Sequence, residues 1–245
     1  MTKDMYPETS PQQIKALTFD VFGTVVDYRR SITTLGADIT QRTGVQVDWA
    51  TFADEWRDAY RPGMDAAMEA NDAWVNVDDI YRQALYTLTP KFGLNELPAD
   101  AYEELAGVWT KLIPWGDSVP GLTRLRSRFI IGTMSNGNVR MLTDMARHAG
   151  LPWDVILSAE LCGAYKPDPR PYQMALELLR LKPEELLMVA AHADELRAVR
   201  GLGIKTAFIL RPLEHGPGVE LDVEGMESFD YVANDLTDLA TQLGT

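Results

Sequence analysis

The chain has 245 residues, of which 46% are hydrophobic and 24% charged, a balance typical of a globular protein with a sizeable core. The formal net charge of -13 argues against partners such as nucleic acid or anionic membrane surfaces, because both select basic patches. No run approaches the roughly 20 apolar residues of a membrane span, and the polar segment 1–13 lacks the apolar core of a signal peptide. The single cysteine, Cys162, excludes an internal disulfide. We therefore expect a cytoplasmic protein.

The first predicted element is a buried strand of a parallel sheet, indicated by the apolar run from Ile14 to Phe19. The run ends at Asp20, and Gly23 then permits a tight turn. Open parallel sheets bind ligands beyond the carboxyl ends of their strands, so Asp20 lies where chemistry is expected. Its carboxylate is either a nucleophile that forms a covalent ester with substrate or an ordinary residue that starts a turn.

The stretch 28–115 is predicted to be helical, with no convincing strand. Capping residues and apolar spacing predict helices over 28–43, 49–60, 64–70, 78–91 and 98–109, with a break or kink at Pro62-Gly63. A block of helices that follows the first strand indicates a helical cap inserted over residues 28–115.

Strands and helices alternate from about residue 116 onward. Apolar runs predict strands over 129–134, 155–157, 186–191 and 206–210, with an edge strand at 231–233. Such alternation implies right-handed crossovers and an α/β fold with a doubly wound parallel sheet. Residues 14–27 and 116–245 are expected to form this core.

Polar residues stand at the end of each core strand. They are Asp20, Ser135-Asn136, and His192 with Asp194 and Glu195, while Lys166 lies in a loop between them. Each has a plain structural explanation when it is taken singly, such as a helix cap, a solvated loop lysine or acids at a helix N-terminus. Because parallel strands end at one edge, we expect these side chains to meet in one pocket.

Four stretches resemble the motifs of the haloacid dehalogenase superfamily. They are, in chain order, Asp20-Val21-Phe22-Gly23-Thr24, Met134-Ser135-Asn136-Gly137, Lys166-Pro167-Asp168 and Val189-Ala190-Ala191-His192-Ala193-Asp194-Glu195. The resemblance extends from about Ile14 to Leu239 and implies a Rossmann-like core with an inserted cap.

Phe22 decides between the chemistries of that superfamily. Its phosphatases carry a second Asp at this position, which protonates a poor alkoxide leaving group. Phenylalanine donates no proton, whereas a halide is a weak base that needs none. The chain therefore resembles the type II (L-2-)haloacid dehalogenases, which use no metal or other cofactor. A Mg²⁺-dependent phosphatase or phosphonatase acting on a small phosphorylated metabolite is the alternative, and a non-catalytic binding module is a third hypothesis.

The resemblance implies a mechanism for short 2-haloacids. Asp20 would displace the halide and form an ester, which water would hydrolyse to the 2-hydroxy acid. Thr24 and Lys166 would hold the Asp20 carboxylate ionised. The residues expected to bind substrate or halide, or to hydrogen-bond within the site, are Phe22, Arg57, Ser135, Asn136 and Tyr172, with Arg61 as the alternative to Arg57.

The fourth motif departs from the family at two positions. Ala190 stands where Ser or Thr is usual, and His192 where Asn is usual; a histidine there could orient or activate water, or bind halide when it is protonated. The counting of the motif favours Glu195 over Asp194 as its acid. The sequence does not identify the residue that activates water. It also leaves open the preferred halide, the cleavage of carbon–fluorine bonds and the stereochemistry. A homodimer is expected only because dimers are common.

Overall fold

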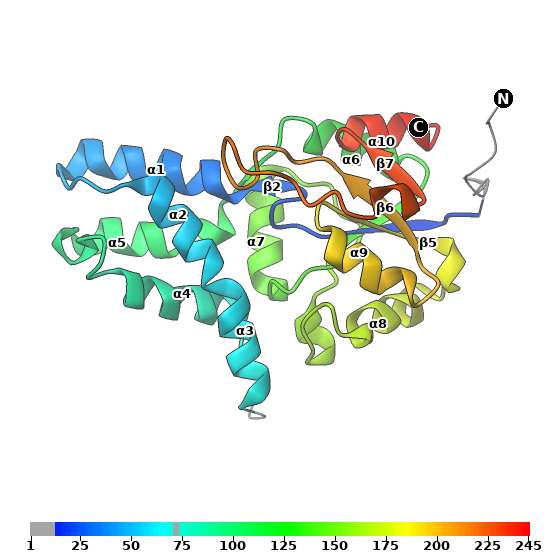
Figure 1. Ribbon diagram of the computed structural model, residues 1–245, viewed down its shortest axis with the longest axis horizontal. Helices are drawn as coiled ribbons and strands as arrows, with labels where there is room; N and C mark the ends of the chain where they lie inside the picture. The colour runs from blue at the N-terminus through cyan, green and yellow to red at the C-terminus, as the bar shows by residue number, and fades with distance from the viewer. Residues whose placement is uncertain (1–12, 71–73) are drawn as a thin grey trace.

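The computed structural model describes residues 13–70 and 74–245 (Figure 1). Most of the N-terminal segment, for which the sequence predicts no signal peptide, lies outside these described residues. Within them, no helix combines the length and the apolar character needed to cross a membrane.

A five-stranded parallel sheet forms the centre of the fold, as the alternation of apolar runs predicts. Its spatial order is β4-β1-β5-β6-β7. The strands are β1 (Ala16–Phe19), β4 (Ile130–Thr133), β5 (Leu186–Ala190), β6 (Lys205–Ile209) and β7 (Tyr231–Ala233). Strand β1 lies between β4 and β5, and Leu17 is in register with Ile131 and Leu187. The carboxyl ends of the three strands therefore meet at one edge.

Helices cover both faces of this sheet, which explains why its strands are almost continuously apolar. Successive residues of β1 point to opposite faces, so Leu17 belongs to one buried cluster and Ala16 to another. The first face packs against α6 (Ser118–Arg126), α7 (Val139–Ala149) and α10 (Leu236–Gln242). The second packs against α8 (Pro169–Leu179) and α9 (Ala193–Arg200) (Figure 1).

The remaining long helices lie together beside the sheet (Figure 1). They are α1 (Tyr28–Thr43), α2 (Trp49–Asp58), α3 (Tyr60–Glu69), α4 (Val77–Leu88) and α5 (Ala99–Ala106). Two short strands, β2 (Val26–Asp27) and β3 (Ile113–Pro114), pair antiparallel where the chain leaves for these helices and returns. We call this group of five helices the cap; its separation from the core at residues 28 and 115 stays a prediction.

Three local predictions were wrong. The described part of the stretch 28–115 includes a strand, β3, which the sequence does not reveal because it is two residues long and depends on pairing with β2. Residues 155–157 form only an isolated bridge, from Val155 to Gly132, instead of a strand. The helix break falls at Ala59 and not at Pro62-Gly63, because Pro62 occupies the first turn of α3, where its missing N–H costs no hydrogen bond.

The close contact between α6 and α10 generates a stability prediction. A Cβ added at Gly121 would lie 2.6 Å from the Leu236 carbonyl carbon, so Gly121→Ala forces backbone apart. We expect a loss of about 1–3 kcal/mol in the free energy of unfolding, measured by urea titration. Gly116→Ala is the matched control, since a Cβ there meets nothing within 4 Å. Equal effects of the two substitutions would contradict this packing.

Candidate active site

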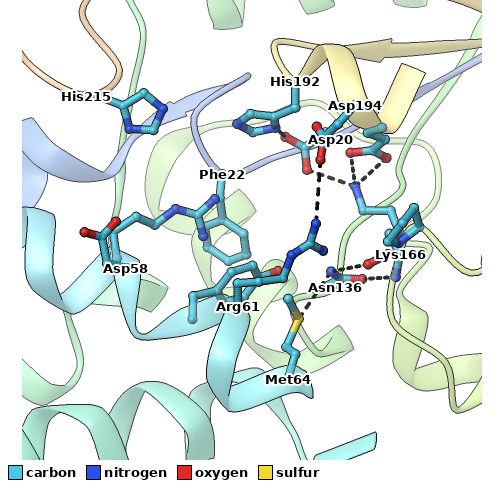
Figure 2. A pocket seen from close by; sticks show the side chains of 14 residues that line it. Asp20, Phe22, Asp58, Arg61, Met64, Asn136, Lys166, His192, Asp194 and His215 are labelled. Carbon is cyan, nitrogen blue, oxygen red and sulfur yellow. Dashed lines mark hydrogen bonds and ion pairs between the residues drawn. The ribbon is translucent and has the colours of Figure 1, made fainter. Parts of the chain in front are cut away.

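The carboxyl ends of β1, β4 and β5 form one wall of a cavity of about 260 Å³, and the cap helices α2 and α3 form the other (Figure 2). Asp20 follows β1, Asn136 follows β4 and His192 follows β5, and all three line the cavity as expected from the parallel topology. The other lining residues are Phe22, Arg57, Asp58, Tyr60, Arg61, Met64, Lys166, Pro167, Asp194, Glu195 and His215.

Asp20 is held by three side chains. Its Oδ1 accepts a hydrogen bond from Lys166 Nζ at 2.9 Å, and its Oδ2 accepts one from Thr24 Oγ1 at 2.7 Å. His192 Nδ1 lies 3.2 Å from the same Oδ2. Thr24 is fixed in turn, because its hydroxyl accepts the N–H of Ala191 at 2.9 Å. Both oxygens of the carboxylate thus have a defined orientation toward the cavity.

The charges around Asp20 keep it ionised. Only 6% of its surface is exposed, and this burial alone would raise its pKa. The Lys166 ammonium and the His192 ring oppose burial and hold the pKa of Asp20 well below its ordinary value. A buried carboxylate that stays charged at neutral pH, with no proton to lose first, is suited to nucleophilic attack.

Lys166 joins Asp20 to a second buried acid. Its Nζ lies 2.9 Å from Asp20 Oδ1 and 2.8 Å from Glu195 Oε1, and the lysine is 6% exposed. The Tyr172 hydroxyl donates to Glu195 Oε1 at 3.0 Å. Burial and the nearby Asp20 charge raise the pKa of Glu195, although Lys166 opposes them. Glu195 is thus a better proton acceptor than an ordinary surface glutamate.

Asp20, His192 and Glu195 bring ligand atoms within 4.8 Å of one another, the spacing that a metal ion requires. The chemistry of this set fits Mg²⁺ poorly. Lys166 already places a positive charge between the two carboxylates, and one of the three donors is an imidazole, whereas Mg²⁺ prefers oxygen ligands.

Phe22 and Arg57 define the cap side of the cavity. Phe22 is 2% exposed, and its ring lies 6.0 Å from the ring of Trp109. The Arg57 guanidinium donates to the Tyr81 hydroxyl at 2.9 Å and lies 4.5 Å above the Tyr60 ring. This cation has aromatic faces and one phenol as partners, so it retains the capacity to bind an anion in the cavity.

Arg61 and Asp194 lie at the exposed mouth of the cavity. Their side chains are 52% and 61% exposed and form an ion pair at 3.6 Å. Glu195, by contrast, is 8% exposed and faces Lys166. The geometry therefore places Glu195 near Asp20 and Asp194 near solvent, in the arrangement that the motif count favours.

Two residues of the predicted site are absent from the lining of the cavity. Ser135 is fully buried, its hydroxyl accepts the N–H of Gly137 at 3.1 Å, and it does not line the cavity. Tyr172 does not line it either and contacts Glu195. Asn136 does line it, and its Oδ1 accepts the Lys166 N–H at 2.6 Å.

Several residues of this region have no place in the predicted site. Tyr60 and Met64 come from α3 in the cap, and His215 comes from the loop after β6. Glu214 precedes His215 in that loop, is 2% exposed, and lies 2.9 Å from His192 Nε2. One signal was present in the sequence: residues after a parallel strand lie at the edge where its neighbours also end.

Comparisons with known proteins show what this chain is similar to. A family model described as haloacid dehalogenase-like hydrolase matches residues 14–203. The (S)-2-haloacid dehalogenase 4A of Burkholderia cepacia is 28% identical over 206 residues, which cover 81% of this chain and 84% of that protein. The crystal structure of a defluorinating L-2-haloacid dehalogenase is 42% identical, with a TM-score of 0.89 over 98% of this chain and 99% of that one. A second L-2-haloacid dehalogenase structure is also 42% identical, with a TM-score of 0.88 over 94% and 98%.

The buried ion-pair network predicts a large stability effect at Lys166. Lys166→Met leaves two buried carboxylates without their cation, and we expect the free energy of unfolding at neutral pH to fall by about 3–5 kcal/mol. The deficit should shrink as the pH is lowered, because the carboxylates then take up protons. Urea titrations at several pH values measure both effects.

Lys15→Met is the matched control for this experiment. Lys15 is 61% exposed in its ion pair with Glu185 at 2.6 Å, and its loss should cost under about 1 kcal/mol at any pH. A Lys166→Met deficit as small as the control's, or one independent of pH, would contradict the network.

Proposed function

Because this chain belongs to the haloacid dehalogenase-like hydrolases, we propose that it hydrolyses short 2-haloacids to 2-hydroxy acids through an ester on Asp20. One observation carries the proposal: the charged, buried Asp20 faces a cavity in which Phe22 stands where a phosphatase needs an acid. The (S)- and L-2-haloacid dehalogenases at 28% and 42% identity support the same substrate class.

In the first step, an Asp20 oxygen attacks the carbon that bears the halogen. The new carbon–oxygen bond forms as the carbon–halogen bond breaks, and the halide leaves with the bonding electrons. Thr24, Lys166 and His192 orient the carboxylate for this displacement. No proton is transferred, so the absence of an acid at Phe22 costs the reaction nothing.

The reaction involves two negative charges, the substrate carboxylate and the departing halide. The two arginines of the cap wall lie in different places and suit different charges. Arg57 lies deep, 6.0 Å from the Phe22 ring, where the departing halide gains charge only as the bond breaks. Arg61 lies at the mouth, and with Asn136 it is suited to the substrate carboxylate, which is charged throughout. We assign the halide to Arg57 and the carboxylate to Arg61 and Asn136.

In the second step, water hydrolyses the ester at the Asp20 carbonyl carbon. Glu195 is the proton acceptor that we assign to this water, because it is buried 2.8 Å from Lys166 and borders the cavity. Tyr172 supports this role from behind by its hydrogen bond to Glu195 Oε1.

Asp20→Asn tests the nucleophile. We expect halide release from 2-chloropropionate to fall on the order of 10³-fold or more, since the amide is a poor nucleophile. In a single turnover in ¹⁸O-water, the label should enter Asp20 of the wild-type protein and not the first product molecule.

Asp38→Asn is the control, because Asp38 is half exposed and pairs with Arg42 in α1, remote from the cavity residues. No turnover of fluoro-, chloro- or bromo-substituted acids by the wild type would refute the proposal. Chelator-sensitive hydrolysis of nitrophenyl phosphate would favour the phosphatase alternative. Fluoroacetate belongs in the screen because one relative at 42% identity is described as defluorinating.

The arginine assignment predicts a split between kinetic constants. Arg57→Gln removes an interaction that strengthens as the halide forms, so kcat should fall about 10²-fold or more. Arg61→Gln should raise KM with a smaller effect on kcat, because the carboxylate is bound equally before and during reaction. Steady-state kinetics on 2-chloropropionate measure both; the opposite split would reverse the two assignments.

A further inference from the structure

Glu214 reaches the residue beside the nucleophile from the loop that follows β6. Its Oε1 lies 2.9 Å from His192 Nε2, while His192 Nδ1 lies 3.2 Å from Asp20 Oδ2. Asp20, His192 and Glu214 thus form a continuous chain of acid, imidazole and acid. The imidazole lines the cavity, whereas Glu214 is 2% exposed and does not line it.

The Glu214 carboxylate is held in place by the fold. Gly23 provides the space, because a Cβ at that residue would lie 2.0 Å from Glu214 Oε1. The Glu214 N–H donates to the Arg211 carbonyl at 3.0 Å. Arg211 is anchored by a bidentate ion pair with Asp117, at 2.8 and 2.7 Å, and by the Thr24 carbonyl at 2.9 Å. The loop is therefore fixed to the same turn that carries the nucleophile.

The hydrogen bonds of His192 determine its charge. A neutral imidazole has one N–H and can donate to only one carboxylate, whereas an imidazolium donates to both. Burial lowers the pKa of His192, but Glu214 and Asp20 together raise it well above the ordinary value. Burial alone would raise the pKa of Glu214. The nearby His192 opposes this effect, and the pKa of Glu214 is lowered overall.

Other charged groups act on this pair from the surrounding elements. Glu195 of α9 interacts with His192. Arg57 of α2 and His215 of the same loop interact with Glu214, and His215 Nε2 lies 4.0 Å from its Oε1. Since His215 is half exposed and farther away, His192 is the principal counter-charge of this buried acid.

We propose that Glu214 is a positioning residue that keeps His192 as an imidazolium. The His192 imidazolium then stabilises negative charge on Asp20, while Glu195 activates the water. The catalytic consequence rests on the proposed function. Water oxygen bonds to the Asp20 carbonyl carbon and gives one proton to Glu195. The ester carbon–oxygen bond then breaks, the hydroxy acid oxygen takes that proton, and the hydroxyl left on Asp20 releases its proton to solvent. The imidazolium keeps both of its protons throughout.

The test begins with the resting protein, without any substrate. The chain has three histidines, so ¹⁵N NMR resolves the His192 ring, identified by its loss in His192→Gln. In the wild type, the titration midpoint of His192 should lie well above the ordinary value of a histidine. In Glu214→Gln its titration midpoint should fall by about one pH unit or more, because the amide accepts a hydrogen bond without carrying charge.

Glu220→Gln is the matched control, since it makes the same change at an exposed residue of the same loop and should not move the midpoint. The basic limb of kcat/KM for 2-chloropropionate should shift with the NMR midpoint in Glu214→Gln. A wild-type His192 that titrates near pH 6.5 would overturn the proposal without any variant. If Glu214→Gln lowers kcat/KM equally at every pH and does not shift the His192 midpoint, the proposal is also overturned, and the role of Glu214 is structural. If no haloacid is turned over, the proposed function fails, while the NMR titration still decides the Glu214–His192 coupling.

Discussion

The buried Lys166 ammonium between Asp20 and Glu195 is the interaction on which the rest of the site depends. Without this cation, burial and mutual repulsion would raise the carboxyl pKa values until one of the two acids took up a proton. With Nζ at 2.9 and 2.8 Å from the two acids, Asp20 stays charged and Glu195 stays near it. The parallel order β4-β1-β5 makes this arrangement possible, because it brings residues distant in sequence to one sheet edge.

The cavity concentrates positive groups in a protein whose overall charge is negative. The chain carries a net charge of -13, yet positive groups from separate elements surround Asp20 and its cavity, among them Lys166, His192 and Arg57. Exposed charge is screened over about 8 Å at physiological salt, whereas buried pairs are screened much less. An anionic substrate therefore depends on the few cations of the cavity.

The cap supplies what the sheet edge lacks. Asp20, Lys166 and Glu195 lie at the carboxyl ends of the strands or in the loops near them, but Arg57 and the aromatic wall come from helices between β2 and β3. Phe22 connects the two parts: it belongs to the turn after β1, and its ring packs against Trp109 of the cap segment. Phe22 thus stands in place of the acid that a phosphatase carries there, and its ring also completes an apolar wall.

The sequence by itself determined the parallel α/β core, the order of its strands along the chain and the residues at their ends, because apolar periodicity and turn chemistry are local properties. The resemblance of four short motifs then indicated the chemistry of Asp20, Phe22 and Lys166. Only the tertiary structure showed that Ser135 and Tyr172 do not line the cavity, and it placed Glu195 against Lys166, as the motif count favours. It also revealed Glu214, because its partner His192 is 22 residues away and only the packing of β5 beside β6 brings the two together.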